Sequence, residues 1–173
     1  MVEKLNSNNV SLAGEFAVLS QLALRGYVAN MTLGNTKGVD ILVADPEGGR
    51  MLKLEVKTNY RSTRSGGSKS KDFGNYVNGW IMSEKHEQMN DPILFFCFVN
   101  ISRDRKSFRF YIVPSAVVAD YVRREHQHWL IGEGNGKRKD NRIRQFRVGR
   151  GSEKYPIPTP TVEQYEDNWD FKC

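Results

Sequence analysis

The stretch GVDILVADPEGGRMLKLEVKT, residues 38–58, decides the fold expected for this chain. Two short segments rich in Val, Leu and Ile, residues 39–44 and 51–57, have the composition of β-strands. Between them, residues 45–49 read DPEGG, which is typical of a turn. The stretch therefore predicts a β-hairpin.

The second strand of this hairpin alternates between two kinds of side chain. In residues 51–57 the even-numbered positions are Leu, Leu and Val, and the odd-numbered ones are Met, Lys, Glu and Lys. Successive side chains of a strand point to opposite faces, so Glu55 and Lys57 share a face. Asp40 in the first strand can project toward the same side. Asp40, Glu55 and Lys57 are therefore expected to converge.

A helix is predicted before the hairpin, from about residue 12 to 25, with Ser11 as its N-cap and Gly26 at its end. Its apolar stripe comprises Leu12, Phe16, Leu19 and Ala23. Glu15 falls at the edge of this stripe rather than opposite it. Its carboxylate either faces the body of the protein or reaches water from the stripe's edge.

Two carboxylates with an ammonium group beside them suit metal-assisted hydrolysis of a phosphodiester. Asp40 and Glu55 can hold Mg²⁺, or Mn²⁺, and the backbone carbonyl of Val56 can complete the metal sphere. Lys57 can orient the attacking water or offset negative charge. The alternative for Glu55 and Lys57 is a solvated strand face with a weak ion pair.

The spacing of an acidic residue two positions before a lysine is weak evidence by itself. It also occurs at Asp104–Lys106 in a polar turn and at Asp170–Lys172 near the C-terminus. Only Glu55–Lys57 lies on an amphipathic strand with an acidic residue on its hairpin partner. This context separates Glu55–Lys57 from the other two occurrences.

On these residues the chain resembles the PD-(D/E)xK nuclease superfamily, which has the restriction-endonuclease-like fold. The similar stretch runs from Gly14 and Glu15 through residues 38–40 to residues 54–58. Val39 stands where the family pattern has proline. The resemblance implies an α/β fold with a central mixed β-sheet flanked by helices.

The resemblance also implies roles for individual residues. In the family pattern the Asp before the hairpin turn and the Glu of Glu-x-Lys bind the metal, and the Lys serves catalysis. These roles fall on Asp40, Glu55 and Lys57, and Glu15 matches a helix Glu that assists the site in several branches. The implied activity is Mg²⁺-dependent cleavage of DNA.

The rest of the chain fits a single domain, residues 1–173. A nuclease-like core is expected over about residues 11–130, with a buried strand at 93–100, then a basic segment at 132–151 and a tail at 152–173. His86, His126 and His128 lack cysteine partners at zinc spacing and are expected to be exposed on helices.

Basic residues are in excess, at 26 against 20 acidic ones, so the formal net charge is +6. Two basic stretches are expected to contact DNA phosphates. The residues assigned to this role are Arg61, Arg64, Lys69, Lys71, Lys137, Arg138, Lys139, Arg142 and Arg144. The first stretch falls in a Gly- and Ser-rich segment, residues 58–79, which is expected to be a mobile loop.

Several other classes of protein are disfavoured. No apolar run approaches the ~20 residues that span a bilayer, and the two cysteines offer no disulfide framework, so a cytoplasmic location is expected. A homodimer is expected because one active site cuts one strand. A non-catalytic nucleic-acid-binding module on the same fold is the alternative, and a purely structural protein would leave the polar strand face unexplained.

Overall fold

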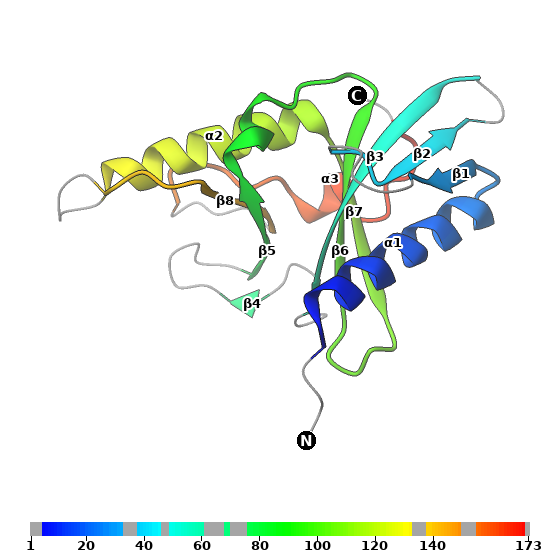
Figure 1. Cartoon of the computed structure of the whole chain (residues 1–173). Helices are drawn as coiled ribbons and strands as arrows, with labels where there is room; N and C mark the ends of the chain where they lie inside the picture. Colours follow the sequence, from blue (N-terminus) through cyan, green and yellow to red (C-terminus); the bar gives the residue numbers. More distant parts are fainter. Residues whose placement is uncertain are drawn as a thin grey trace.

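The computed structural model describes residues 5–32, 38–45, 49–60, 68–69, 76–132, 138–149 and 155–171. Its elements are shown in Figure 1. They are α1 (Ser7–Leu24), β1 (Val28–Met31), β2 (Ile41–Ala44), β3 (Met51–Tyr60), β4 (Ser68–Lys69), β5 (Tyr76–Ser83), the 3₁₀ helix η1 (Glu84–Gln88), β6 (Leu94–Ile101), β7 (Phe108–Pro114), α2 (Ser115–Ile131), β8 (Ile143–Gly149) and α3 (Val162–Tyr165).

A five-stranded mixed sheet forms the centre of the fold, in the order β1-β2-β3-β6-β7. Its pairs are antiparallel except β3 with β6, which are parallel. Between β3 and β6 the chain contributes β4 and β5 to a second sheet, β4-β5-β8. The predicted hairpin is confirmed as β2 and β3, and the mixed α/β architecture flanked by helices is confirmed as well.

The central sheet is covered on both faces. On one face, Leu54 and Val56 of β3 pack with α1 and with alternate residues of β6 and β7. On the other face, the remaining residues of β6 pack with α2 and with the second sheet. Every residue of β6 is buried, as predicted for a strand covered on both sides.

The predicted register of α1 is wrong. The helix begins four residues before Ser11, and Asn6 is the N-cap, its side chain accepting a hydrogen bond from the Asn8 amide at 2.9 Å. Its buried face is formed by Gly14, Val18 and Leu22. Phe16 of the predicted stripe is 57% exposed. Apolar residues surround almost the whole of this helix, so periodicity alone did not identify the face that packs.

The C-terminal segment returns to the core. Trp169 and Phe171 are buried with Val18 and Leu22 of α1, and Glu166 forms an isolated bridge with Tyr111 of β7. The buried core therefore draws on residues well beyond position 130.

Gly14 is where α1 touches β3. A Cβ at this position would lie 1.9 Å from Thr58 Oγ1 and 2.9 Å from Thr58 Cβ, closer than real contacts allow. We expect Gly14→Ala to lower the free energy of unfolding by about 1–3 kcal/mol through overpacking, as measured by urea denaturation. Ser20→Ala on the exposed side of α1 should change it by at most about 0.5 kcal/mol. Equal stability of both variants would contradict this contact.

Candidate active site

The site lies at the edge of β3 where β2 has ended. The last regular pair of the hairpin joins Ile41 to Leu54. Beyond it, Asp40 directs its backbone N–H to the Leu54 carbonyl at 2.8 Å and leaves the sheet. Residues 55–60 of β3 therefore continue along β6 without a β2 neighbour, and this gap is where the polar side chains gather.

The Asp40 carboxylate fills the first position of this gap. Its Oδ2 accepts a hydrogen bond from the Val56 amide at 2.7 Å. Burial raises the pKa of Asp40, and the negative charge of Glu55 raises it further, whereas the Val56 hydrogen bond and Lys57 lower it; the net shift is upward. Asp40 thus lies at the sheet edge, next to the peptide between Glu55 and Val56, rather than on the face that carries Glu55.

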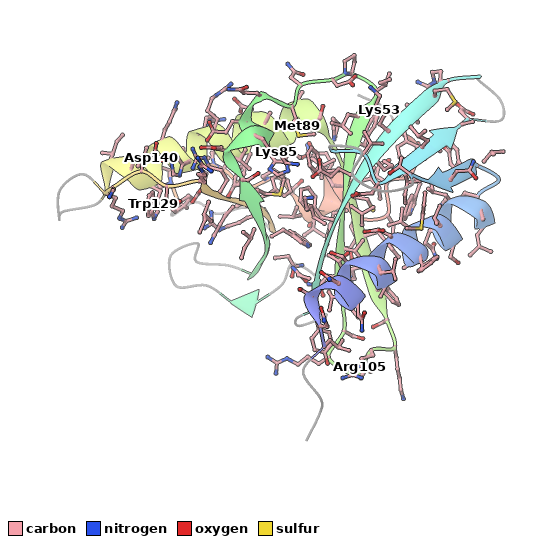
Figure 2. The ribbon with its side chains drawn as sticks, viewed as in Figure 1. Lys53, Lys85, Met89, Arg105, Trp129 and Asp140 are labelled. Atoms are coloured by element: carbon pink, nitrogen blue, oxygen red, sulfur yellow. The ribbon has the colours of Figure 1, made fainter. Side chains whose placement is uncertain are left out.

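Glu55 is buried, with only 2% of its surface exposed. Its Oε1 lies 2.5 Å from Lys57 Nζ, 3.8 Å from Lys85 Nζ and 3.1 Å from His86 Nε2. Figure 2 shows Lys85 on the side of η1 that faces β3. Burial by itself raises the pKa of Glu55, but the hydrogen bond from His86 and the charge of Lys57 outweigh it and lower the pKa to about 2. A solvated strand face is therefore excluded for Glu55.

The second oxygen of Glu55 has a different environment. Among the residues that the structure describes, none forms a hydrogen bond with the buried Glu55 Oε2. Gly38, with φ +76°, approaches this oxygen so closely that a Cβ there would lie 3.2 Å from it and 2.8 Å from Met89 Cε. A side chain at position 38 would therefore press against both Met89 and this oxygen, and glycine avoids that clash.

The Val56 carbonyl points to the same edge of β3. The N–H and C=O of one strand residue face the same side, and the Val56 N–H faces Asp40. The carbonyl oxygen of Val56 is therefore directed toward the gap left by β2. In the described ranges, no group of three or more His, Cys, Asp and Glu side chains is arranged to hold a metal ion. A cation at this edge would use two carboxylates and this carbonyl.

Glu15 of α1 reaches the same edge. Burial raises its pKa, the negative charge of Asp40 raises it further, and Lys57 lowers it, with a net upward shift. Its electrostatic partners are thus two of the predicted site residues. Because Gly14 is in contact with Thr58 of β3, the next residue of the helix is held beside the gap.

Removing the charge of Glu15 tests whether this carboxylate assists the site. If the chain cleaves DNA as the family resemblance implies, Glu15→Gln should fold and bind DNA normally but cleave it about 10- to 100-fold more slowly, the usual effect of losing a group that orients a metal-bound ligand. Asp120→Asn, which changes a half-exposed carboxylate on α2, is the control. A wild-type cleavage rate for Glu15→Gln would leave Glu15 with no role at the site.

The basic residues assigned to DNA divide into three groups. Arg61, Arg64, Lys71 and Lys137 lie outside the described residues, as does the side chain of Lys69. Arg138, Lys139 and Arg142 are exposed. Arg144 departs from its predicted role because it is 6% exposed and its guanidinium bonds Glu87 and the carbonyl of Asn141.

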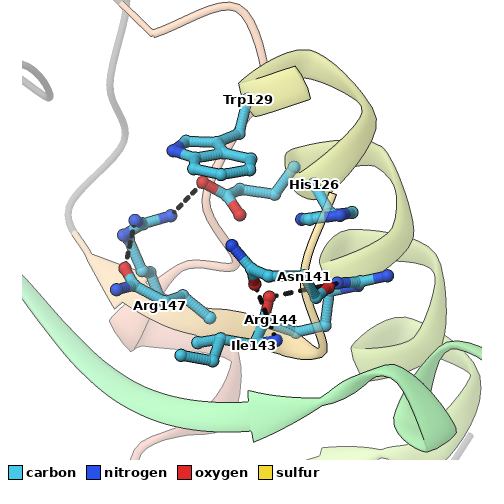
Figure 3. Close-up of a pocket in the computed structure, with 8 residues that line it drawn as sticks. His126, Trp129, Asn141, Ile143, Arg144 and Arg147 are labelled. Carbon is cyan, nitrogen blue, oxygen red and sulfur yellow. Dashed lines mark hydrogen bonds and ion pairs between the residues drawn. The ribbon is translucent and has the colours of Figure 1, made fainter. Parts of the chain in front are cut away.

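A cavity of about 170 Å³ lies between α2 and β8, apart from this site (Figure 3). Its charged side chains are paired within the protein: Arg147 with Glu125 at 2.7 Å, and His126, which lines the cavity, with Asp140 at 2.7 Å. The groups that line it are thus committed to holding β8 against α2. The carboxylates at the β3 edge are therefore a better candidate for chemistry than this cavity.

Comparison with known proteins supports the fold. No protein-family model and no curated protein matches the chain. Among solved structures, it is similar to the bacterial homing endonuclease I-Ssp6803I, with a TM-score of 0.52 and 15% sequence identity. The likeness covers 95% of this chain and 91% of that one. At this identity the likeness concerns the arrangement of helices and strands.

Two residues of the site were not expected from the sequence. Lys85 and His86 both come from η1, and His86 is 3% exposed. The prediction that His86 and His126 are exposed is wrong, since both are buried. A signal was available for His86, because Ser83 three residues earlier has the spacing of a capping pair. Nothing local in the sequence indicated that η1 lies against Glu55.

Proposed function

We propose that this protein is a Mg²⁺-dependent DNA endonuclease that hydrolyses phosphodiester bonds at the β3 edge. The observation that carries the proposal is the buried Glu55 carboxylate. One of its oxygens faces three basic side chains, and the other is buried close to Gly38 without a described hydrogen-bond partner. A carboxylate with a free buried oxygen needs a further partner, since leaving it unpaired is costly.

The donor set suits a hard divalent cation. Asp40 and Glu55, with the Val56 carbonyl, would hold Mg²⁺ or Mn²⁺ through oxygen alone, as these ions prefer. When bound, Mg²⁺ lowers the pKa of a water molecule and polarises a phosphoryl oxygen. These ligands and Lys57 correspond to the PD-(D/E)xK pattern, and we propose that the chain is a member of that superfamily.

The protein's own residues supply positioning and charge around the phosphate. Lys57 is partly exposed and lies against Glu55, so its ammonium can orient the attacking water or offset charge on the phosphate. Lys85 is more exposed than Lys57 and lies farther from Glu55. This position suits a contact with the phosphate backbone of the DNA at the rim of the site. Glu15, whose charge interacts with those of Asp40 and Lys57, can accept a hydrogen bond at this edge of the site.

DNA is the proposed substrate on two grounds. The chain carries a net charge of +6, and the exposed basic residues Arg138, Lys139 and Arg142 precede β8. The solved structure that shares its fold is described as a homing endonuclease. We also propose that the protein acts as a homodimer, because cutting both strands of a duplex needs two such sites.

The function is tested by incubating the purified chain with supercoiled, linear, single-stranded and branched DNA in Mg²⁺ or in EDTA. We expect cleavage of at least one substrate in Mg²⁺ only. Binding without cleavage of any of them would favour the alternative of a non-catalytic nucleic-acid-binding module. Cleavage that persists in EDTA would contradict the proposed metal dependence.

The exposed basic residues before β8 are expected to contribute to DNA binding through phosphate contacts. Changing Arg138, Lys139 and Arg142 together to Gln should reduce the salt dependence of binding by up to about three units of slope, since each phosphate contact contributes ~0.9. The loss should be similar for all DNA sequences.

The matched control changes Arg103, Arg105 and Lys106 to Gln. These three basic residues lie in the β6–β7 turn, and Figure 2 shows Arg105 at the tip of that hairpin, away from Asp140. The control should leave the slope near that of the wild type. Equal slopes for both triple variants would mean that the segment before β8 is an ordinary solvated surface.

A further inference from the structure

His86 is a buried histidine without a role in the proposed hydrolysis. It lies on η1, and its imidazole packs edge-on against Phe96 of β6, with ring centroids 5.7 Å apart. In the register of the sheet, Phe96 is paired with Glu55 of β3. The ring therefore lies over the same position of the sheet as the carboxylate that it touches.

The hydrogen bonds of His86 show which ring nitrogen serves Glu55. Nδ1 lies 2.9 Å from both the backbone nitrogen and the carbonyl oxygen of Ser83, so it is held at the start of η1. Nε2 lies 3.1 Å from Glu55 Oε1. Because an ionised carboxylate only accepts hydrogen bonds, Nε2 is the donor of this pair.

The two carboxylate oxygens of Glu55 have different contacts. Oε1 receives the His86 hydrogen bond and the charges of Lys57 and Lys85. Oε2 has no described hydrogen-bond partner. Of the three donors, His86 has a rigid ring that packs against Phe96. The two lysines have flexible side chains that are partly exposed. His86 is therefore the donor best able to fix the orientation of the carboxylate.

We propose that His86 is the positioning residue of the active site, holding Glu55 by Oε1 so that Oε2 is presented to the divalent cation. This inference rests on the proposed function. Ligands of catalytic metals are commonly oriented by a hydrogen bond from a neighbouring group, and loss of that group lowers metal affinity or activity about 10- to 100-fold.

Two substitutions separate positioning from packing. His86→Gln can place an amide N–H near the Nε2 position and so keep the donor to Glu55. His86→Asn keeps a polar atom near the Nδ1 position, where it can accept the Ser83 N–H, but lacks a group that reaches Glu55. His126→Asn is the matched control, because His126 is also buried and also bonds a carboxylate through Nε2, that of Asp140.

The test measures Mn²⁺ binding to each full-length protein without DNA, from the electron paramagnetic resonance signal of the free ion. We expect His86→Asn to bind Mn²⁺ about 10- to 100-fold more weakly than wild type, and His86→Gln and His126→Asn to stay within about threefold. Thermal unfolding in EDTA checks that each variant is folded.

Wild-type Mn²⁺ affinity in His86→Asn would overturn the inference, as would equal losses in His86→Asn and His86→Gln, which would indicate packing alone. These failures are distinct from failure of the proposed function. If wild-type protein bound no Mn²⁺ and Glu55→Gln cleaved DNA normally, the metal site itself would be refuted. If Glu55→Gln were inactive while His86→Asn bound Mn²⁺ as the wild type does, only the proposed role of His86 would be refuted.

Discussion

Asp40→Asn and Glu55→Gln are each expected to lower Mg²⁺-dependent cleavage of DNA by about 10³-fold or more. Each substitution removes a negative oxygen from the proposed metal ligands, and a bound metal contributes several kcal/mol of transition-state stabilisation. Since each 1.36 kcal/mol is a factor of ten in rate, three orders of magnitude or more should be lost. The measurement is the single-turnover rate of cleavage at saturating protein.

Binding of DNA should survive both substitutions, because affinity derives chiefly from phosphate contacts made by basic residues elsewhere. Asp104→Asn is the matched control. Asp104 also lies two residues before a lysine, but in the β6–β7 turn, where it accepts hydrogen bonds from Ser102 and the Lys106 amide. Its cleavage rate should equal that of the wild type. Full cleavage by either Asp40→Asn or Glu55→Gln would remove the proposed mechanism.

Lys57→Met is expected to reduce cleavage by about 10²- to 10³-fold, the usual cost of losing one donor that stabilises developing charge. Lys57 Nζ lies 2.5 Å from Glu55 Oε1 and its side chain is largely buried. The methionine side chain retains most of its volume and packing. Affinity for DNA, measured in EDTA so that no metal-dependent cleavage occurs, should change little. The measurement is the cleavage rate at saturating Mg²⁺.

Lys85→Met is the companion variant. Lys85 Nζ lies 3.8 Å from the same oxygen and its side chain is about half exposed. Exposed charges interact weakly, so we expect a change of no more than about tenfold. If Lys85→Met proved the more damaging of the two substitutions, the catalytic ammonium would belong to η1 and not to β3.

The hairpin and its polar residues could be predicted because both depend on local pattern. The turn DPEGG and the period of two in residues 51–57 fix the face on which Glu55 lies. They do not fix what covers that face. Glu55 is buried because η1, about thirty residues later, places His86 against it, and that packing depends on the crossover through the second sheet.

The register of α1 could not be predicted for a related reason. Glu15 is the only charged residue of α1, so apolar residues occupy nearly every direction around it. Which of these faces packs is decided by the close approach of Gly14 to Thr58, a tertiary contact. Glu15 nevertheless lies beside the site, because it flanks the buried face in the true register as well as in the expected one.

The sequence predicts that most charged residues are exposed, but it does not show which individual residues are buried. Arg138, Lys139 and Arg142 are exposed, but Arg144 in the same basic segment is buried. The alternation of β8 turns Arg144 inward, and Glu87 of η1 provides its partner. A composition-based assignment of DNA contacts had no means of separating Arg144 from its neighbours.

In the described part of the chain, no helix is both long and apolar enough to cross a bilayer.

The most direct measurement is an anomalous difference map of wild-type crystals soaked in Mn²⁺, with Glu55→Gln crystals treated in the same way. If Asp40 and Glu55 hold the catalytic metal, the wild-type map has a peak within bonding distance of the Asp40 carboxylate and of Glu55 Oε2. The Glu55→Gln map should lack it. A wild-type map without this peak, at a Mn²⁺ concentration that supports full cleavage of DNA in solution, would show that the metal acts elsewhere.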